Sequence, residues 1–365
     1  METKHFPKAF SAFVFLALCQ PSLADDVRPM RLGIVSLTHG HSARFVAKAL
    51  TRADVKLVAI VEPDEELVAK AMERHTVPRS LFRSTLEDLL RADEVDAVAA
   101  FTSTYEHRAV VEACAAKGVH VMMEKPLAVS LEHARAMKAA ATKGGIHVLV
   151  NYEPVWSPAY QRGFALSHTD QAVGKIRRVI AHDGNDGPVG RSPPEFVRWL
   201  IDPKLNGGGA LFDFGCYGAA IASWLLDNER PLSVSATLQN LKPAQYPRVE
   251  DEATIVLNYR HTMGVIMGSW NWPIARKDFE VYGAKGYVMA RFPNEVRMRL
   301  GAKEQSVDAG SAPADWADSL TYFRGVVQGR ITPSGPPSLE TNMIVTEILD
   351  AARESSRTGR RIDLK

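Results

Sequence analysis

A lysine suited to proton chemistry, Lys125, stands in the sequence Glu124-Lys125-Pro126, directly after the apolar segment 119–123. An ammonium group at the end of a strand can donate a charged hydrogen bond to a reacting hydroxyl group. A lone lysine in this position is more often a surface residue. Its role therefore depends on the groups that the fold brings beside it.

A carboxylate and a phenol follow three consecutive glycines in the second half of the chain. Asp213 lies four residues before Tyr217, after Gly207-Gly208-Gly209. On a helix this spacing places both side chains on one face, where a carboxylate can orient or tune a phenol as an acid–base pair. The alternative is an aspartate that caps a helix and a tyrosine that belongs to the core. We predict that Asp213 and Tyr217 share a helical face.

The segment 36–41 (SLTHGH) stands where a dinucleotide-binding loop would join the first strand to the first helix. The usual fingerprint G-x-G-x-x-G provides glycines for the turn, for close approach of the pyrophosphate and for helix packing. All three glycine positions are replaced here, and the one glycine present is a place off. Hydroxyl groups, backbone N–H groups and the helix N-terminus remain to hold phosphate. The residues expected to do so are Ser36, Thr38, His39, Gly40 and His41.

Polar residues also follow the later strands of this region. Glu62 ends the second strand, where a carboxylate can bind the ribose hydroxyls and repel a 2′-phosphate, which favours NAD over NADP. The alternative for Glu62 is a solvated carboxylate at a strand end. Ligands of open α/β sheets bind at the carboxyl ends of the strands. We therefore also expect cofactor contacts from Thr102, Ser103, His107 and Glu124.

Short apolar strands alternate with helices between Arg31 and Val150. The expected strands are 31–36, 55–61, 95–101, 119–123 and 146–150, and the helices are 44–52, 65–75, 106–117 and one that begins after Ser130. Near-continuous apolar strands are typical of a parallel sheet buried on both faces. The alternation implies right-handed crossovers and a doubly wound α/β sheet. We assign residues 25–150 to this nucleotide-binding type of domain.

After Tyr152 the strands become longer and alternate apolar with polar residues, which predicts an antiparallel sheet. The expected strands are 176–182, 232–241, 252–259, 262–270, 278–282, 286–291 and 296–300. Helices are expected over 216–226 and from Ser338 to Gly359. Residues 151–365 are therefore predicted to form an α+β domain with a large, mostly antiparallel sheet.

The first 24 residues differ from the rest. A weakly basic start, the apolar run 9–19 and the ending Ser22-Leu23-Ala24 are typical of a secretory signal peptide cleaved after Ala24. The alternatives are a disordered start or a membrane anchor. We expect a periplasmic or secreted protein whose mature chain has no membrane span, since the apolar run is too short to cross a bilayer.

Composition limits the partners and the cofactors. The chain has 46% hydrophobic and 24% charged residues and a net charge of +2, which gives no reason to expect nucleic acid as a partner. Cys114 and Cys216, the two cysteines after the signal, are interpreted as buried thiols rather than a disulfide framework. No His/Cys cluster has the spacing of a metal site, so no metal is expected.

These segments, in this order, resemble the glucose–fructose oxidoreductase/inositol dehydrogenase/rhizopine-catabolism (Gfo/Idh/MocA) family. The resemblance extends from Arg31 to Asp363, and further motifs carry it: Glu124-Lys125-Pro126-Leu127-Ala128, Val249-Glu250-Asp251-Glu252-Ala253 and Tyr282-Gly283-Ala284-Lys285-Gly286. It implies a Rossmann domain that binds NAD, with NADP less favoured. It also implies a second domain whose sheet forms the interface of a homo-oligomer.

The resemblance also implies roles for single residues. Lys125 resembles the catalytic lysine that donates a hydrogen bond to the substrate hydroxyl. The peptide bond between Lys125 and Pro126 is a candidate cis peptide. Asp213 resembles the carboxylate of the site. Tyr217 stands where many members have histidine, and it would be the general base; its free phenol would titrate near pH ~10, so a nearby Lys125 ammonium or the nicotinamide cation must lower its pKa. Side chains expected to bind the substrate are Asn151, Tyr152, His182, Arg198, Trp199 and Trp272.

Three functions are compatible with these residues. The first is an NAD-dependent oxidoreductase that removes hydride from a hydroxyl group of a sugar or glycoside. The second is a glycoside hydrolase that oxidises its sugar transiently, eliminates the glycosidic group and ends with no net change in NADH. The third is a sugar-binding protein that has lost the cofactor together with the glycines. The first is the function that we predict.

Overall fold

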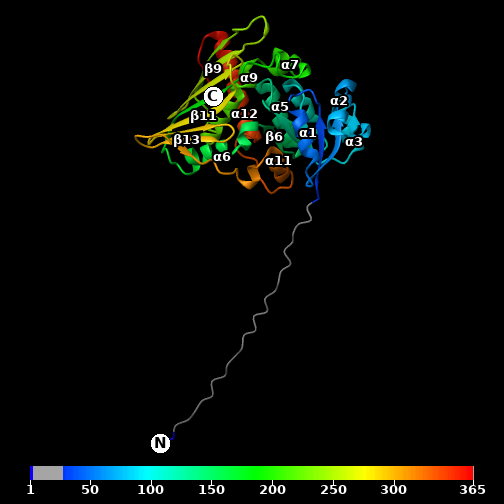
Figure 1. Ribbon diagram of the computed structural model, residues 1–365, viewed down its shortest axis with the longest axis horizontal. Helices are drawn as coiled ribbons and strands as arrows, with labels where there is room; N and C mark the ends of the chain where they lie inside the picture. Colours follow the sequence, from blue (N-terminus) through cyan, green and yellow to red (C-terminus); the bar gives the residue numbers. More distant parts are fainter. Residues whose placement is uncertain (3–27, 365) are drawn as a thin grey trace.

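The computed structural model describes residues 28–364, together with Met1 and Glu2. The predicted signal peptide therefore lies, apart from its first two residues, outside the described residues. Two sheets stand side by side, and helices surround the first and line one face of the second (Figure 1). Among the described residues, we find no helix that is both long enough and apolar enough to traverse a bilayer.

The first sheet has six parallel strands in the order β3-β2-β1-β4-β5-β6. Its strands are β1 (Met30–Val35), β2 (Val55–Val61), β3 (Phe82–Arg83), β4 (Ala97–Ala100), β5 (His120–Glu124) and β6 (Val148–Asn151). Every residue of β4 is buried, as in a parallel strand covered on both faces. The strand order reverses between β1 and β4, so a ligand crevice is expected at their carboxyl ends. The predicted doubly wound sheet is confirmed.

Helices connect these strands, and side-chain caps explain where several of them begin. The α-helices of this region are α1 (Ser42–Leu50), α2 (Glu65–His75), α3 (Leu86–Ala92), α4 (His107–Ala115) and α5 (Leu131–Gly144), with short η1 (Arg79–Leu81) and η2 (Thr104–Glu106). Asp64, Thr85 and Ser130 each accept hydrogen bonds from backbone N–H groups of the helical turn that follows them. Strand β3 and helix α3 were not expected, because each is too short to show a period.

The second sheet has nine strands in the order β14-β13-β12-β11-β7-β10-β9-β8-β15. The strands are β7 (Ile176–Gly184), β8 (Ser233–Gln239), β9 (Glu252–Asn258), β10 (Met263–Ser269), β11 (Arg276–Gly283), β12 (Tyr287–Arg291), β13 (Glu295–Arg299), β14 (Gln305–Val307) and β15 (Ile362–Asp363). All neighbours are antiparallel except β7 and β10, which are parallel. The predicted strands are present with small shifts of their ends.

One face of the second sheet packs on helices, and the other faces outward. The remaining helical segments are η3 (Glu153–Trp156), α6 (Pro158–Phe164), η4 (Ala165–Thr169), α7 (Pro194–Leu200), α8 (Pro203–Asn206), α9 (Ala210–Asp213), α10 (Gly215–Leu225), η5 (Ala314–Trp316), α11 (Ser319–Val327) and α12 (Leu339–Thr358). Helix α10 is buried along its whole length. A Cβ on Gly218 would lie 2.4 Å from Ile266 of β10, so this glycine lets α10, which carries Tyr217, approach the sheet closely.

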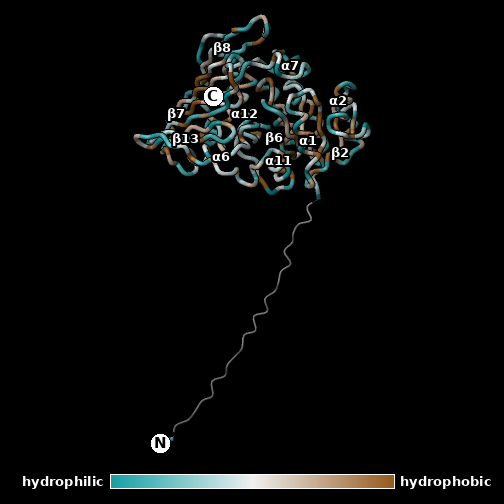
Figure 2. Tube along the Cα trace, in the orientation of Figure 1, coloured by the Kyte–Doolittle hydropathy of each residue, from teal (hydrophilic) through white to brown (hydrophobic). Residues whose placement is uncertain are grey.

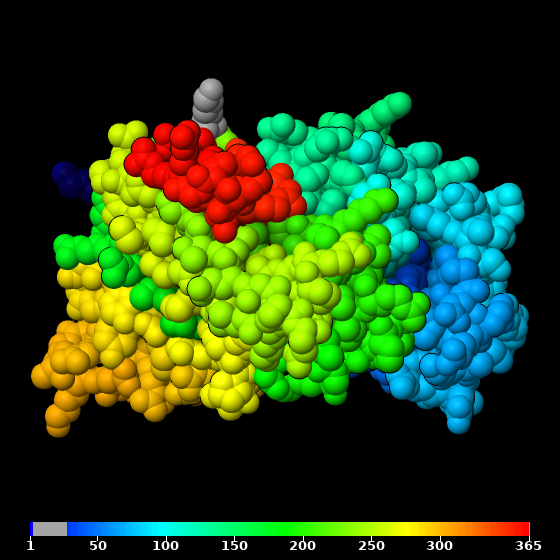
Figure 3. Space-filling model, turned by 90° about the horizontal axis from the view of Figure 1, so that it is seen from above, coloured from blue at the N-terminus to red at the C-terminus, as the bar shows by residue number. Residues whose placement is uncertain are grey.

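Two helices from the end of the chain tie the sheets together. In α11, Leu320 and Phe323 are fully buried in one core with Leu32 and Ile34 of the first sheet. Asp350 of α12 accepts a 2.7 Å hydrogen bond from the backbone N–H at the start of α5. Figure 3 shows the last residues, in red, lying against the part of the surface to which α5 belongs. Hydrophobic stretches follow the strands, whereas polar stretches dominate the outer loops (Figure 2).

Candidate active site

Lys125 and Asp213 form a buried ion pair between the two sheets. Lys125 follows β5 and is 6% exposed, and Asp213 ends α9 and is 7% exposed. The ammonium donates to an Asp213 carboxylate oxygen and, at 2.9 Å, to the Asp213 backbone carbonyl. The other carboxylate oxygen accepts a 2.8 Å hydrogen bond from Nε1 of Trp270. Burial disfavours the ammonium, but the charge and hydrogen bond of Asp213, together with further nearby groups that include Glu124, outweigh this cost and hold the pKa of Lys125 above its usual value.

The expectation that Asp213 and Tyr217 share a face of one helix is wrong. The chain bends at Phe214, so Asp213 ends the short α9 and Tyr217 lies in the first turn of α10. Lys125 nevertheless brings the two together, since its Nζ contacts Asp213 and lies 5.1 Å from the centre of the Tyr217 ring. The predicted Lys125–Pro126 cis peptide is present.

Tyr217 is 3% exposed and is held by its neighbours on several sides. The ring of Tyr152 packs edge-on against it at 5.6 Å between centroids. A second ammonium, that of Lys277 on β11, lies 4.7 Å from the ring centre and 3.5 Å from the phenol oxygen. Burial raises the pKa of Tyr217 well above its usual value, so its use as a base depends on nearby positive charge.

These groups line a cavity of about 290 Å³ between the two domains. The second domain contributes most of its wall, and His39 and His41 close it from the side of the first domain. The cavity is lined by His39, His41, Lys125, Asn185, Gly187, Pro188, Arg191, Ser192, Phe196, Leu200, Asp213, Phe214, Tyr217 and Lys277. Such a cavity suits a small polar molecule whose hydroxyl groups meet one lysine and one phenol.

The three glycines fix the position of α9, and with it the position of Asp213. The Glu250 carboxylate accepts hydrogen bonds from the N–H groups of Gly209 at 2.7 Å and Leu211 at 3.1 Å. The Glu250 carbonyl accepts a further bond from Ala210 at 3.0 Å. A Cβ on Gly209 would lie 1.9 Å from that carbonyl oxygen. Only glycine therefore permits this approach, and the resulting anchor aims Asp213 at Lys125.

The turn between β1 and α1 keeps the backbone shape of a dinucleotide loop without its glycines. Ser36 has a φ of 69°, in the left-handed region where the fingerprint places glycine. Its hydroxyl lies 3.0 Å from the Thr38 hydroxyl. The Glu62 carboxylate accepts the Leu37 N–H at 2.7 Å and the Asp64 N–H at 3.0 Å, so it fixes the loop as well as marking the end of β2.

The same loop offers donors to a pyrophosphate. Within the described chain, the backbone N–H groups of His39 and Gly40 make no hydrogen bond, and they precede the N-terminus of α1. The His39 side chain is 3% exposed and packs on Phe196 and Trp199 of α7, at 4.6 and 5.8 Å between ring centres. The residues present therefore fit NAD, with Glu62 for the ribose and these N–H groups for phosphate.

We expect Glu62→Gln to weaken NAD binding about tenfold and to reduce the preference for NAD over NADP. The carboxylate can accept more bonds than the two it makes to the loop, and its charge would repel a 2′-phosphate. Titrations of both cofactors by calorimetry measure the effect, with Glu65→Gln on the exposed side of α2 as the control. Equal affinities of variant and parent would contradict this role.

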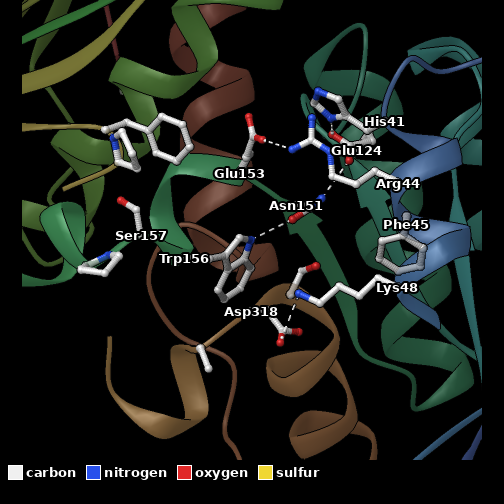
Figure 4. Close-up of a pocket in the computed structure, with 15 residues that line it drawn as sticks. His41, Arg44, Phe45, Lys48, Glu124, Asn151, Glu153, Trp156, Ser157 and Asp318 are labelled. Carbon is white, nitrogen blue, oxygen red and sulfur yellow. Dashed lines mark hydrogen bonds and ion pairs between the residues drawn. The ribbon is translucent and has the colours of Figure 1, made fainter. Parts of the chain in front are cut away.

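His41 lines both the catalytic cavity and a second cavity of about 330 Å³, and Glu124 lines the second. His41 Nδ1 lies 3.3 Å from the Glu124 carboxylate, which also accepts a 2.8 Å hydrogen bond from Asn151. Trp156 in turn donates to Asn151 at 2.8 Å. Figure 4 shows this chain of contacts beside Arg44, which pairs with Glu153. Burial raises the pKa of Glu124, but the histidines and Asn151 lower it more, so the carboxylate is ionised.

His39, His41 and Glu124 also offer ligand atoms that lie within 4.8 Å of one another. No spacing of residues indicates this cluster, because Glu124 is far from the two histidines along the chain. The contacts of His39 explain it without an ion, since His39 Nδ1 accepts the His41 backbone N–H at 3.1 Å.

The other predicted cofactor residues, Thr102, Ser103 and His107, follow β4, and their buried side chains make hydrogen bonds within the protein. The Thr102 hydroxyl donates to the Ser103 carbonyl at 3.1 Å, and Ser103 forms a capping box with Glu106 at the start of η2. His107 is 1% exposed, and its Nδ1 lies 3.1 Å from the Leu127 carbonyl. His107 thus supports the loop that follows Lys125 rather than lining either cavity.

His107 should make stability depend on pH. Burial lowers the pKa of His107 to about 4, against ~6.5 for an unfolded histidine. The folded state therefore resists protonation, and stability present above pH ~6.5 is lost as the pH falls towards 4, by up to roughly 3 kcal/mol. Urea unfolding at pH 7 and pH 4.5 measures this. His107→Asn should reduce the difference, to which other buried histidines such as His39 also contribute, whereas the exposed His261→Asn should leave it in full; an unchanged difference in His107→Asn would refute the assignment.

The six predicted substrate residues are dispersed. Asn151 lines the second cavity, and Tyr152 donates to Asn342 at 2.8 Å while supporting Tyr217. His182 lies on the outer face of the second sheet, where it pairs with Asp278 at 2.9 Å. Trp199 packs on His39. Arg198 and Trp272 do not line the catalytic cavity.

Comparisons with solved structures place the fold. An inositol dehydrogenase homolog from Azotobacter vinelandii, solved with NAD⁺, has a TM-score of 0.80 at 20% identity and covers 92% of this chain and 98% of its own. Aldose-aldose oxidoreductase from Caulobacter crescentus has a TM-score of 0.77 at 22% identity, covering 92% and 100%. Both likenesses extend over the two domains.

Relatives of known activity and two family models also match this chain, and they too are oxidoreductases or domains of oxidoreductases. D-apiose dehydrogenase of Paraburkholderia graminis is 28% identical over 91% of this chain and 88% of its own. Human trans-1,2-dihydrobenzene-1,2-diol dehydrogenase is 26% identical over 72% and 75%. Residues 30–152 match the model described as an oxidoreductase family with an NAD-binding Rossmann fold, and residues 168–289 match the GFO/IDH/MocA C-terminal domain. These matches to one family together span more than half of the chain, which belongs to the Gfo/Idh/MocA family of NAD-binding oxidoreductases.

Proposed function

We propose that this oxidoreductase removes hydride from a secondary hydroxyl group of a sugar or a cyclic polyol and transfers it to NAD. The observation that carries the proposal is the buried set of Lys125, Asp213 and Tyr217 in one cavity at the carboxyl edge of the nucleotide-binding sheet. The names of two relatives, an apiose dehydrogenase and a dihydrodiol dehydrogenase, support a substrate with neighbouring hydroxyl groups.

Each residue has a part that follows from its contacts. Lys125 directs N–H groups at two Asp213 oxygens, which leaves its third N–H for the oxygen of the substrate. Asp213, fixed by Trp270, keeps Lys125 charged and oriented. Tyr217 accepts the hydroxyl proton as the carbon loses hydride. NAD, when bound, supplies the hydride acceptor. Lys125 then stabilises the negative charge that develops on the oxygen.

A panel of free sugars, polyols and glycosides tests the proposal when NADH formation and release of the aglycone are measured together. We expect NADH in proportion to oxidised product. Free sugar without net NADH would instead identify the transient-oxidation hydrolase. Absence of bound nicotinamide in mass spectra of the denatured protein, together with no thermal shift on adding NAD, would overturn both and leave a sugar-binding protein.

We also propose that the chain is exported and that it assembles through its second sheet. The first 24 residues support export, and mass spectrometry of the mature N-terminus would reveal cleavage after Ala24 or its absence. The outward face of the second sheet supports assembly, because partly exposed Ile180, Val265 and Met267 lie on adjacent strands. Light scattering of Val265→Glu should show a smaller particle than the parent. A parent that is already monomeric would contradict the assembly.

A further inference from the structure

The phenol of Tyr217 has a second ammonium neighbour, Lys277, a residue that the sequence suggested only as a partner for substrate hydroxyl groups. Lys277 lies on β11, opposite Asp183 of β7, and its side chain is 20% exposed. Its Nζ lies 3.5 Å from the Tyr217 oxygen and 3.3 Å from a Glu153 carboxylate oxygen. Lys277 also lines the catalytic cavity. It therefore stands at the reacting oxygen, between the cavity and the carboxylate of η3.

Lys125 does not fill this position. Its ammonium lies over the Tyr217 ring at 5.1 Å from the centre, and it directs hydrogen bonds at two oxygens of Asp213. The expectation that Lys125 would be the positive charge that activates Tyr217 is therefore met only in part. The ammonium that makes a hydrogen bond with the phenol oxygen is that of Lys277, at 3.5 Å, and a charge at this distance interacts strongly with a phenolate.

The charges around Tyr217 otherwise oppose its ionisation. Beyond burial, the charges that disfavour the phenolate come from β5, η3 and α9, and they are Glu124, Glu153 and Asp213. Cys216 of α10 adds no charge, because burial raises the pKa of its thiol. The positive groups that face Tyr217 are Lys125 and Lys277. Burial raises the pKa of Asp183 well above its usual value, so this cross-strand neighbour does not neutralise Lys277.

Glu153 is the ionised partner that holds Lys277 in place. Burial raises its pKa, but Lys277, His41 and Arg44 lower it more, so the carboxylate stays charged. Arg44 donates to its other oxygen at 3.0 Å, as Figure 4 shows. Lys277 is thus tethered on one side by an ionised carboxylate and is presented on the other to the phenol.

We propose that Lys277 is a positioning residue for the oxidation, which holds the Tyr217 oxygen and stabilises its phenolate form, while Glu153 anchors the lysine. The inference rests on the proposed function, in which the substrate hydroxyl proton forms the O–H bond of Tyr217. Lys277 remains an ammonium throughout and exchanges no proton with the substrate.

Ionisation of residue 217 can be measured directly, without substrate or cofactor. 3,5-Difluorotyrosine, whose phenol titrates lower than that of tyrosine, is incorporated in place of Tyr217 alone, and ¹⁹F NMR follows its titration. We expect Lys277→Met to raise the midpoint by about 1 to 2 pH units, whereas Lys277→Arg keeps it near the parent value. Lys277→Gln removes the charge but keeps a donor towards Glu153, and it serves if methionine disturbs folding.

Lys242 provides a matched control. Its ammonium is likewise partly buried and tied, to Asp186 at 3.0 Å and to the Trp270 carbonyl at 2.9 Å, but it does not line the cavity. Lys242→Met should leave the titration midpoint of the fluorinated residue 217 unchanged. A midpoint unchanged in both Lys277→Met and Lys277→Gln overturns the inference, even in an active enzyme.

Kinetics of unlabelled protein give the second measurement. Lys277→Met should lower kcat about 10- to 100-fold at neutral pH, with little change in KM, and should move the alkaline rise of kcat to higher pH. Lys277→Arg should recover most of the rate. Equal losses in the arginine and methionine variants would contradict a role through charge. A parent without turnover or NAD binding would refute the proposed function instead, and the NMR titration would still decide the coupling.

Discussion

Replacing Lys125 by methionine should lower kcat/KM about a thousandfold or more, equivalent to about 4 kcal/mol of transition-state stabilisation. The methionine fills most of the volume but cannot donate to the substrate oxygen or stabilise charge on it. Steady-state kinetics with the best substrate of the panel measure the loss, and calorimetry should show NAD affinity nearly unchanged. Lys117→Met, at the exposed end of α4, serves as the control.

The same substitution leaves Asp213 buried without its counter-charge, so a loss of stability is expected as well. The double variant Lys125→Met/Asp213→Asn separates the two effects. Its neutral amide can still meet Trp270, and we expect thermal stability to recover while activity stays low. Recovery of activity along with stability would mean that Lys125 acts on folding rather than on the reaction.

Tyr217→Phe should lower kcat about 100- to 1,000-fold and remove the alkaline rise of activity. The ring and its packing on Tyr152 are kept, and only the acceptor of the substrate proton is lost. Because burial raises the pKa of Tyr217, the reactive phenolate is the minor form at neutral pH. Activity of the parent should therefore rise with pH, by up to tenfold per unit below that pKa.

Measurements of kcat between pH 6 and pH 10 test whether activity rises with pH as expected. Tyr322→Phe, on α11 in the core shared with the first sheet, controls for loss of a buried hydroxyl. A Tyr217→Phe enzyme that keeps the parent's slope would show that another group takes the proton.

The sequence predicted what depends on local pattern. Near-continuous apolar runs alternating with helices identified the first sheet, and apolar residues of period two identified the second, because burial on two faces or on one leaves a different pattern in a strand. Strand ends and a glycine run drew attention to Lys125, Asp213 and Tyr217, and the resemblance to a known family supplied their predicted roles. Their mutual contact was also expected, although the break at Phe214, which depends on tertiary packing, was not.

What could not be predicted depends on register between distant strands. Lys277 contacts Tyr217, and Trp270 contacts Asp213, because of how the second sheet is ordered. Strands β11 and β10 flank β7, and α10 packs on β7 and β10. No spacing along the chain encodes such contacts. The left-handed conformation of Ser36 could not be predicted either. It depends on hydrogen bonds that the loop makes to Glu62 and to the Ser36 hydroxyl, which no local pattern reveals.

The packing of α11 on the first sheet has a consequence for synthesis of the protein. Leu320 and Phe323 belong to the same core as Phe45 and Phe101, so that core stays incomplete until almost the whole chain has been made. We therefore expect that the nucleotide-binding half does not complete its fold ahead of its neighbour, as an N-terminal domain ordinarily does. A nascent chain stalled before residue 319 should therefore remain sensitive to protease across residues 30–150, and should acquire resistance only when α11 emerges.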